Sequence, residues 1–275
     1  MEQSEVPDTP PATEQSAFPP NGAYLQSATI VGTQVHALSL AEATHTIITW
    51  AKNQESRMVC ACNVHMVMEA HDDPAFQAMI NRADMVLPDG MPLAWALVSA
   101  GFKGQTRVSG PDLTLALCKE ASINNITIGF LGSTEATLEA LSNRLSAQFP
   151  SIKIVFINSP PFRPISPEED ASLCKAINSS GTQLLFVGLG CPKQETWMAA
   201  HQGRIPAVML GVGAAFDFHA GILRVAPRWM KNAGLEWLFR LACEPRRLWK
   251  RYLRHNPRYL VFRLKAKIRK SAPNA

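Results

Sequence analysis

Apolar and polar positions follow two periods along this chain, and their alternation predicts a layered fold. Short apolar runs, typical of buried strands, are separated by longer stretches with the spacing of helices. The predicted strands are 58–62, 85–87, 126–131, 153–157, 184–187 and 207–210. The predicted helices are 39–53, 65–69, 74–82, 91–99, 111–121, 134–149, 167–178 and 193–201. Because apolar strands spaced by helices are typical of a parallel sheet covered on both faces, we predict a Rossmann-like α/β fold whose mostly parallel sheet is flanked by helices.

The two ends of the chain differ from this central region. Residues 1–24 are rich in Pro, Ser, Thr and Glu, so we expect a disordered leader without the basic and apolar regions of a signal peptide. Residues 28–31 and 34–36 are predicted to form a hairpin. We expect an α/β core over 25–234 and a basic amphipathic, membrane-binding appendage over 235–275.

Composition refines this picture in two respects. The net charge of +5 is concentrated at the end, since residues 240–275 hold twelve Lys and Arg against one acid, Glu244. A tail of this kind points to a polyanionic partner. No pair of cysteines or histidines has the spacing of a zinc site, so we expect no metal, and no apolar run is long enough to cross a bilayer.

One carboxylate, Asp89, directly follows a predicted strand in the sequence Pro88-Asp89-Gly90. Ligands of open α/β sheets bind outside the carboxyl ends of the strands, so Asp89 is a candidate catalytic group. The alternative is that Asp89 caps the helix that follows, a position that Asp favours.

Other strand ends carry residues suited to an anion. Glycines after a strand, here Gly188, Gly190 and Gly213, let a backbone or a helix N-terminus approach a phosphate, although each also fits a plain tight turn. Lys193 and Gln194 open the helix that follows Pro192, over the predicted cleft. None of these glycines forms the dinucleotide fingerprint, which disfavours a nicotinamide-dependent oxidoreductase.

Two further side chains lie in loops of the same kind. Asn63 ends a predicted strand, and Arg107 lies in a glycine-bearing loop where its guanidinium suits a diphosphate. The alternative for Arg107 is an exposed surface charge. His65 and His219 are interpreted as structural.

The tail combines apolar and basic residues with helical spacing. Leu248, Trp249, Tyr252 and Leu253 are predicted to share one helical face with the cations elsewhere, and Pro257 to interrupt the pattern. A basic amphipathic helix with Trp and Tyr is typical of a membrane surface. Nucleic-acid binding and a simple solvated face are the alternatives.

Five motifs in this order resemble the WecG/TagA/CpsF family of bacterial glycosyltransferases over about residues 28–255. They are LPDG (87–90), RVSGPDL (107–113), GLGCPKQE (188–195), GAAFDFHAG (213–221), and Ala226-Pro227 with GLEWLFRL (234–241) and EPRR (244–247). The resemblance implies an inverting, metal-independent and cofactor-free transfer of a sugar from a UDP-sugar to a polyprenyl-diphosphate-linked saccharide. It also implies a peripheral protein on the cytoplasmic face of the membrane.

The resemblance assigns roles by motif. Asp89 becomes the general base, and Asn63, Arg107 and Gln194 become binders of substrate or of the leaving diphosphate. Lys193 and the glycines Gly188, Gly190 and Gly213 complete this substrate-binding set. Arg240 and Arg247 are expected to meet the diphosphate once the tail is seated on the membrane. Ala61 departs from the Thr that the family usually has, which leaves the identity of the sugar or acceptor open.

The sequence thus predicts a hexosyltransferase that moves N-acetylmannosamine, its uronic acid or glucose in the synthesis of cell-surface polysaccharides. Its expected partners are the UDP-sugar, the lipid-linked acceptor and an anionic membrane contacted through 240–270, with no nucleic acid; self-association is left open. The alternative function is a nucleotide- or nucleic-acid-binding α/β module with a basic C-terminal arm.

Overall fold

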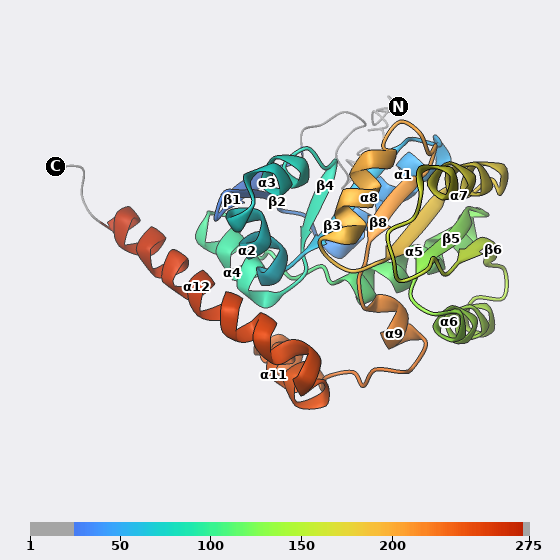
Figure 1. The fold of residues 1–275 in the computed structure, drawn as a ribbon. Coiled ribbons are helices and arrows are strands. Elements are labelled where there is room, and N and C mark those ends of the chain that lie inside the picture. The colour runs from blue at the N-terminus through green and yellow to red at the C-terminus, as the bar shows by residue number, and fades with distance from the viewer. Residues whose placement is uncertain (1–24, 272–275) are drawn as a thin grey trace, which may run out of the picture.

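The protein is built on a parallel β-sheet. The computed structural model describes residues 25–271, and the predicted leader 1–24 lies outside the described residues. The sheet has six strands in the order β4-β3-β8-β7-β5-β6, and every neighbouring pair is parallel (Figure 1). Its strands are β3 (Arg57–Cys62), β4 (Met85–Pro88), β5 (Thr127–Gly132), β6 (Lys153–Asn158), β7 (Leu184–Gly188) and β8 (Val208–Gly211). The predicted α/β fold is confirmed.

Helices connect these strands, and a separate antiparallel hairpin precedes them. The hairpin consists of β1 (Ser27–Ile30) and β2 (Thr33–His36). The helices of the α/β region are α1 (Leu40–Lys52), α2 (Val64–Asp72), α3 (Pro74–Ile80), α4 (Met91–Ser99), α5 (Gly110–Asn124), α6 (Glu135–Gln148), α7 (Pro167–Ser179), α8 (Lys193–His201) and α9 (Ala215–His219). The C-terminal helices are α10 (Arg228–Asn232), α11 (Glu236–Cys243) and α12 (Pro245–Ser271).

The sheet has an apolar layer on each face, because successive side chains of a strand point to opposite sides. In β5, Phe130 joins the layer formed with α1, α5, α6 and α9, whereas the next residue, Leu131, joins the layer formed with α2, α3, α7 and α8. The ring of Phe130 lies 5.4 Å from those of Phe186 and Phe216. Burying a side chain of this size contributes roughly 1.5–3 kcal/mol, so the two layers fix the strand ends that carry the site.

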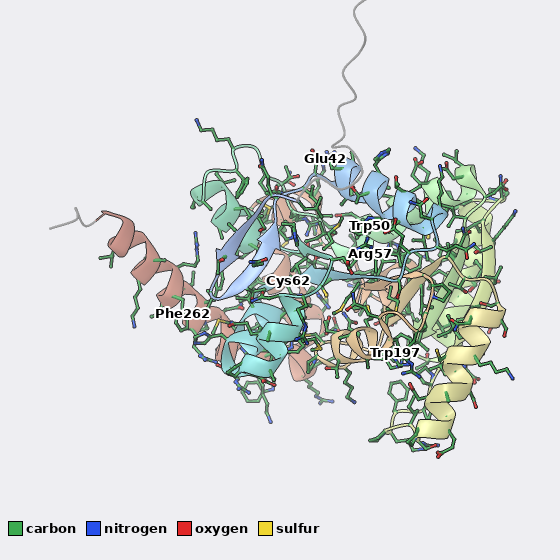
Figure 2. The ribbon with its side chains drawn as sticks, turned by 90° about the horizontal axis from the view of Figure 1, so that it is seen from above. Glu42, Trp50, Arg57, Cys62, Trp197 and Phe262 are labelled. Carbon is green, nitrogen blue, oxygen red and sulfur yellow. The ribbon has the colours of Figure 1, made fainter. Side chains whose placement is uncertain are left out.

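Helix α12 runs unbroken through Pro257, so the prediction that this proline interrupts the helix is wrong. Pro removes one backbone donor, and here contacts on either side of it hold the helix in place. The buried Tyr259 donates a hydrogen bond from its hydroxyl to the carbonyl of Pro92, 3.0 Å away. Phe262 contacts the ring of His71 in α2 with 4.5 Å between centroids, on the side of the molecule seen in Figure 2.

The predicted apolar face of this helix is divided between two environments. Leu248 is buried against the core, and Tyr252 contacts the ring of Trp237 at 5.8 Å. Trp249 and Leu253 instead lie on the outside, with 46% and 68% of their surfaces exposed. Docking of α12 on α2 therefore uses one side of the helix and leaves a second apolar side to solvent. Among the described helices, none combines the length and apolar character needed to span a membrane.

Candidate active site

Asp89 and Asn63 leave the sheet side by side. Strands β3 and β4 are in register with Cys62 opposite Pro88, so the residue after each strand emerges at the same point of the carboxyl edge. The amide of Asp89 donates to the carbonyl of Cys62 at 2.7 Å, and Nδ2 of Asn63 lies 3.5 Å from Oδ2 of Asp89. Two predicted site residues are thereby brought into contact.

The side chain of Asp89 does not cap the following helix. The N-cap of α4 is Gly90, so no side chain caps the start of this helix. Asp89 instead accepts a hydrogen bond at Oδ1 from the amide of Gly110, 3.3 Å away. The capping interpretation is therefore wrong. Asn63 does act as a cap, since its Oδ1 accepts from the first amides of α2.

The surroundings of Asp89 place its ionisation near neutral pH. Burial raises the pKa of its carboxyl to about 7, and the negative charge of Glu236 adds to this rise. The guanidinium of Arg107, the amide of Gly110 and the charge of Arg240 act in the opposite direction. A carboxylate with such a pKa accepts a proton readily at neutral pH, as a general base must.

Arg107 is near Asp89 and forms two salt bridges. Its Nη1 contacts Oε2 of Glu236, and its Nη2 lies 3.3 Å from Oδ2 of Asp112. Only 15% of its side chain is exposed, so the interpretation as a surface charge is wrong. A substrate diphosphate would have to compete with Glu236, which belongs to α11 of the appendage.

A cleft of about 590 Å³ opens above Asp89. It collects every predicted site residue except Arg107, and these are Asn63, Asp89, Gly188, Gly190, Lys193, Gln194, Gly213, Arg240 and Arg247. Gly190 and Gly213 have left-handed backbone conformations, with φ of 81° and 56°. Glycine tolerates such angles without strain, which explains its use in the loops after β7 and β8.

Gln194 links these two loops from below. Its side-chain oxygen accepts from the amides of Gly190 and Gly213 at 3.1 and 3.2 Å. Its amide nitrogen donates to Oε1 of Glu195 at 2.7 Å, and Glu195 is fully buried. With 3% of its surface exposed, Gln194 has a clear structural task in shaping the cleft. The carboxylate partner Glu195 was missed by sequence reasoning.

The appendage contributes three arginines to the cleft. Arg240 comes from α11, and Arg247 and Arg251 come from α12. Arg251 was not predicted, because its basic side chain was expected to face away from the core. Its Nη2 lies 3.4 Å from Oδ1 of Asn63, and burial lowers its pKa. The signal was available, since Arg247 and Arg251 are four residues apart and thus on one helical face.

A second cavity of about 400 Å³ meets the first at Asp89. Five residues line both, namely Asn63, Asp89, Glu236, Arg240 and Arg251. The second cavity runs between α4 and α12, and its aromatic wall consists of Trp95, Trp237, Tyr252 and Tyr259. Arg107 lines this cavity. The carboxyl of Asp89 therefore stands between a polar, glycine-lined space and an aromatic one.

Comparison with known proteins identifies the family of this chain. Residues 28–273 match the family described as Glycosyl transferase WecG/TagA/CpsF. A relative from Bacillus spizizenii, an N-acetylglucosaminyldiphosphoundecaprenol N-acetyl-beta-D-mannosaminyltransferase, is 27% identical over 231 residues, which cover 84% of this chain and 87% of that protein. The chain therefore belongs to the WecG/TagA/CpsF family of glycosyltransferases and is a hexosyltransferase.

Proposed function

We propose that this protein transfers N-acetylmannosamine from a UDP-sugar to N-acetylglucosamine linked to a polyprenyl diphosphate, with Asp89 as the general base. The observation that carries the proposal is the position of Asp89 at the junction of two cavities of different chemistry. The choice of sugar and acceptor follows the activity for which the Bacillus spizizenii relative is named. The uronic acid of N-acetylmannosamine and glucose are the competing donors.

The larger cleft suits the UDP-sugar. The glycine loops at 188–190 and 211–213 line it together with Lys193. Arg240, Arg247 and Arg251 line the same cleft, where their charges would stabilise the leaving diphosphate. These groups lie on both the core and the appendage, so the donor site is complete only when the appendage is docked.

Transfer then requires one proton movement and one displacement. Asp89 takes the proton from the attacking hydroxyl of the acceptor sugar while that oxygen forms a bond to the anomeric carbon. The bond between this carbon and UDP breaks, its electron pair leaves with the diphosphate, and the configuration inverts. A general base contributes about 10²–10⁴-fold, so orientation and the cationic wall must supply most of the remaining acceleration.

The second cavity suits the lipid-linked acceptor. Its aromatic wall between α4 and α12 would contact the first prenyl units, and Lys231 and Arg263, which also line it, carry charges that match a diphosphate. An acceptor in this cavity presents its sugar hydroxyl to Asp89 from the side opposite the donor, as inversion demands.

The outer side of the C-terminal helices suits a membrane surface. Large apolar side chains of these helices are exposed, and they are Trp229, Trp237, Leu238, Trp249, Leu253, Leu260, Leu264 and Ile268. Trp at such positions favours the interface between water and lipid, and the neighbouring cations favour anionic headgroups. We infer a peripheral position on the cytoplasmic face of the membrane, where UDP-sugars and lipid-linked intermediates meet.

The experiment is release of UDP from UDP-N-acetylmannosamine, its uronic acid and UDP-glucose, with and without a short-chain polyprenyl-diphosphate N-acetylglucosamine. We expect acceptor-dependent release from the first donor, lost in Asp89→Asn and kept in Asp73→Asn. Asp73 caps α3, and Asn serves as a cap equally well. Release that survives in Asp89→Asn would refute the assignment of the base, and release from another donor alone would refute that of the sugar.

A further inference from the structure

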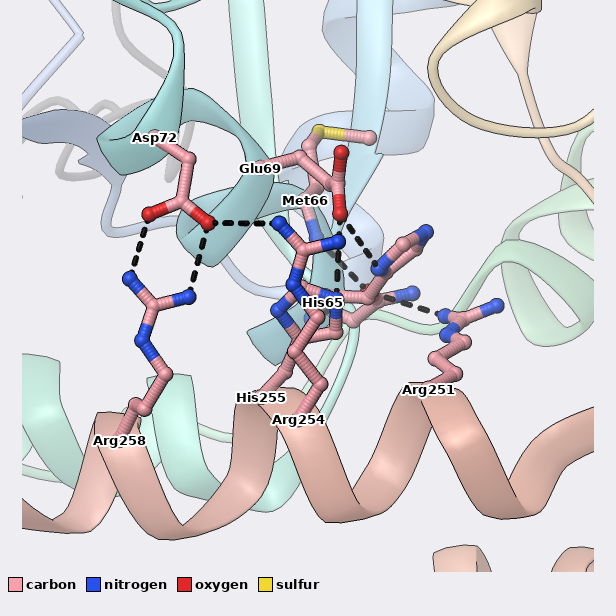
Figure 3. A network of polar contacts seen from close by, with 9 residues as sticks. His65, Met66, Glu69, Asp72, Arg251, Arg254, His255 and Arg258 are labelled. Atoms are coloured by element: carbon pink, nitrogen blue, oxygen red, sulfur yellow. Dashed lines mark hydrogen bonds and ion pairs between the residues drawn. The ribbon is translucent and has the colours of Figure 1, made fainter.

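Three groups able to bind a metal converge where α12 crosses α2. His65 and Glu69 lie one turn apart on α2, and His255 reaches them from α12 (Figure 3). Oε1 of Glu69 lies 3.1 Å from Nε2 of His255 and 3.8 Å from Nδ1 of His65. One donor atom from each of the three residues lies within 4.8 Å of the other two. None of the three residues lines the larger cleft, whereas His65 and His255 line the second cavity.

The imidazole of His65 is oriented as a ligand. Its Nδ1 is buried and has no hydrogen-bond partner. In a neutral ring whose proton is on Nε2, this Nδ1 would present its lone pair to Glu69, whose Oε1 lies 3.8 Å away. A bound ion would satisfy a buried nitrogen that otherwise lacks a hydrogen-bond partner.

We propose that His65, Glu69 and His255 form a binding site for a divalent transition-metal ion, with zinc as the best match. The ion would hold α12 against α2. Two imidazoles and one carboxylate are a ligand set that zinc accepts, with water as the fourth ligand. Zinc ligands at about 2.0–2.2 Å from the metal lie roughly 3.3–3.5 Å from one another in a tetrahedron. The observed separations of 3.1 and 3.8 Å lie on either side of this value. Magnesium and calcium prefer oxygen ligands and fit less well.

Nearby arginines limit the affinity without occupying the site. Arg254 and Arg258 are paired with Asp72, and Arg251 extends to Asn63 (Figure 3). Their charges still repel a cation, because Arg251 and Arg254 lie on α12 within one turn of His255. We therefore expect micromolar affinity, weaker than that of dedicated structural zinc sites.

The position of the ion gives it a role in assembly of the cleft. His255 lies one turn after Arg251 on α12, and His65 lies in the first turn of α2 beside its cap, Asn63. An ion bound to both His255 and His65 would hold α12 against α2 and would thus keep Arg251 in contact with Asn63. The ion is structural in this account, so the metal-independent chemistry proposed above does not depend on it.

Zinc binding tests the site directly. Tag-free full-length protein is freed of metal with a chelator and titrated with Zn²⁺ against a chromophoric competitor, and Co²⁺ is used as a spectroscopic probe of coordination. We expect about one ion per chain and, for Co²⁺, the visible bands of a four-coordinate site. Glu69→Gln and His255→Gln should each weaken binding at least tenfold.

The control is His71→Gln. His71 lies on the same helix and contacts Phe262 of α12, so its loss loosens docking without removing a ligand. Wild type and this control should bind zinc equally, and zinc should raise their melting temperatures while leaving that of His255→Gln unchanged. Equal zinc affinity in all variants, no binding by wild type at about 100 µM zinc, or an equal thermal shift in His255→Gln would each overturn the proposal.

Discussion

Arg251 of the C-terminal helix lies 3.4 Å from the side-chain oxygen of Asn63, the residue whose amide nitrogen contacts Asp89. This relationship joins the appendage to the centre of the cleft through two side chains. Asn63 uses the same oxygen to cap α2. A shift of Arg251 would therefore change both the cap of α2 and the position of Asn63 beside the carboxylate of Asp89. The geometry around the proposed base therefore depends on where α12 is docked.

Arg251→Gln should reduce turnover with little loss of folding. A hydrogen bond to a charged group contributes about 1.5–3 kcal/mol, and 1.36 kcal/mol corresponds to a tenfold change in rate, so a loss of about 10–150-fold in kcat/KM is expected. Arg254→Gln is the matched control, since Arg254 is 61% exposed and faces Asp72. Steady-state UDP release compares the two, and an equal effect in both variants would contradict a specific role for Arg251.

The pH profile should reveal the influence of Glu236 on Asp89. The base is active when ionised, so kcat/KM should fall as the pH drops through about 7. Glu236→Gln removes a negative charge that raises the pKa of Asp89 and frees Arg107, which lowers it. Both changes move the acidic limb of the profile to lower pH. An unmoved limb in this variant would mean that another group controls it.

Ionisation of Asp89 should affect protein stability in the opposite direction to activity: stability should fall as the pH rises. The pKa of this acid is raised from 3.8 to about 7, so the folded protein holds the proton more tightly than the unfolded chain. The resulting stability is present below pH 3.8 and is lost as the pH rises through about 7. Asp89→Asn cannot ionise and should therefore gain stability relative to wild type between pH 5 and pH 8, at up to about 1.4 kcal/mol per pH unit.

Urea unfolding at pH 5 and pH 8 measures this difference. Asp73→Asn provides the control, because that residue caps α3 near the surface. A stability difference between Asp89→Asn and wild type that stays constant with pH would place the pKa of Asp89 close to its ordinary value and weaken its assignment as the base.

Much of the site could be predicted because local patterns encode it. An apolar run that ends in a polar residue and a glycine marks a strand end, which is how Asp89 and Gly188 were found. The burial of Gln194 and the capture of Arg107 by Glu236 could not be found in this way, since both depend on partners brought close only by the fold. Arg251 was missed because amphipathic patterns assign every cation to solvent.

The appendage shows the same limit for backbone structure. Local rules favour a helix end near Pro257, and tertiary contacts of Tyr259 and Phe262 outweigh them. The proposed metal-binding residues could not be predicted as a group either. His255 is remote in sequence from His65 and Glu69, and only docking of α12 on α2 brings the three together.

Gln194→Met should loosen the two glycine loops of the cleft, because the side chain of Gln194 connects them. Met has a similar volume and cannot accept the hydrogen bonds from Gly190 and Gly213, so two amides lose their partner at about 1–3 kcal/mol each where they stay buried. Glu195 loses its donor as well. We expect a lower melting temperature and a higher KM for the UDP-sugar. Gln148→Met on the exposed end of α6 is the matched control. If Gln194→Met lost turnover at unchanged melting temperature and unchanged KM, Gln194 would act on the reacting sugar and its role would be catalytic.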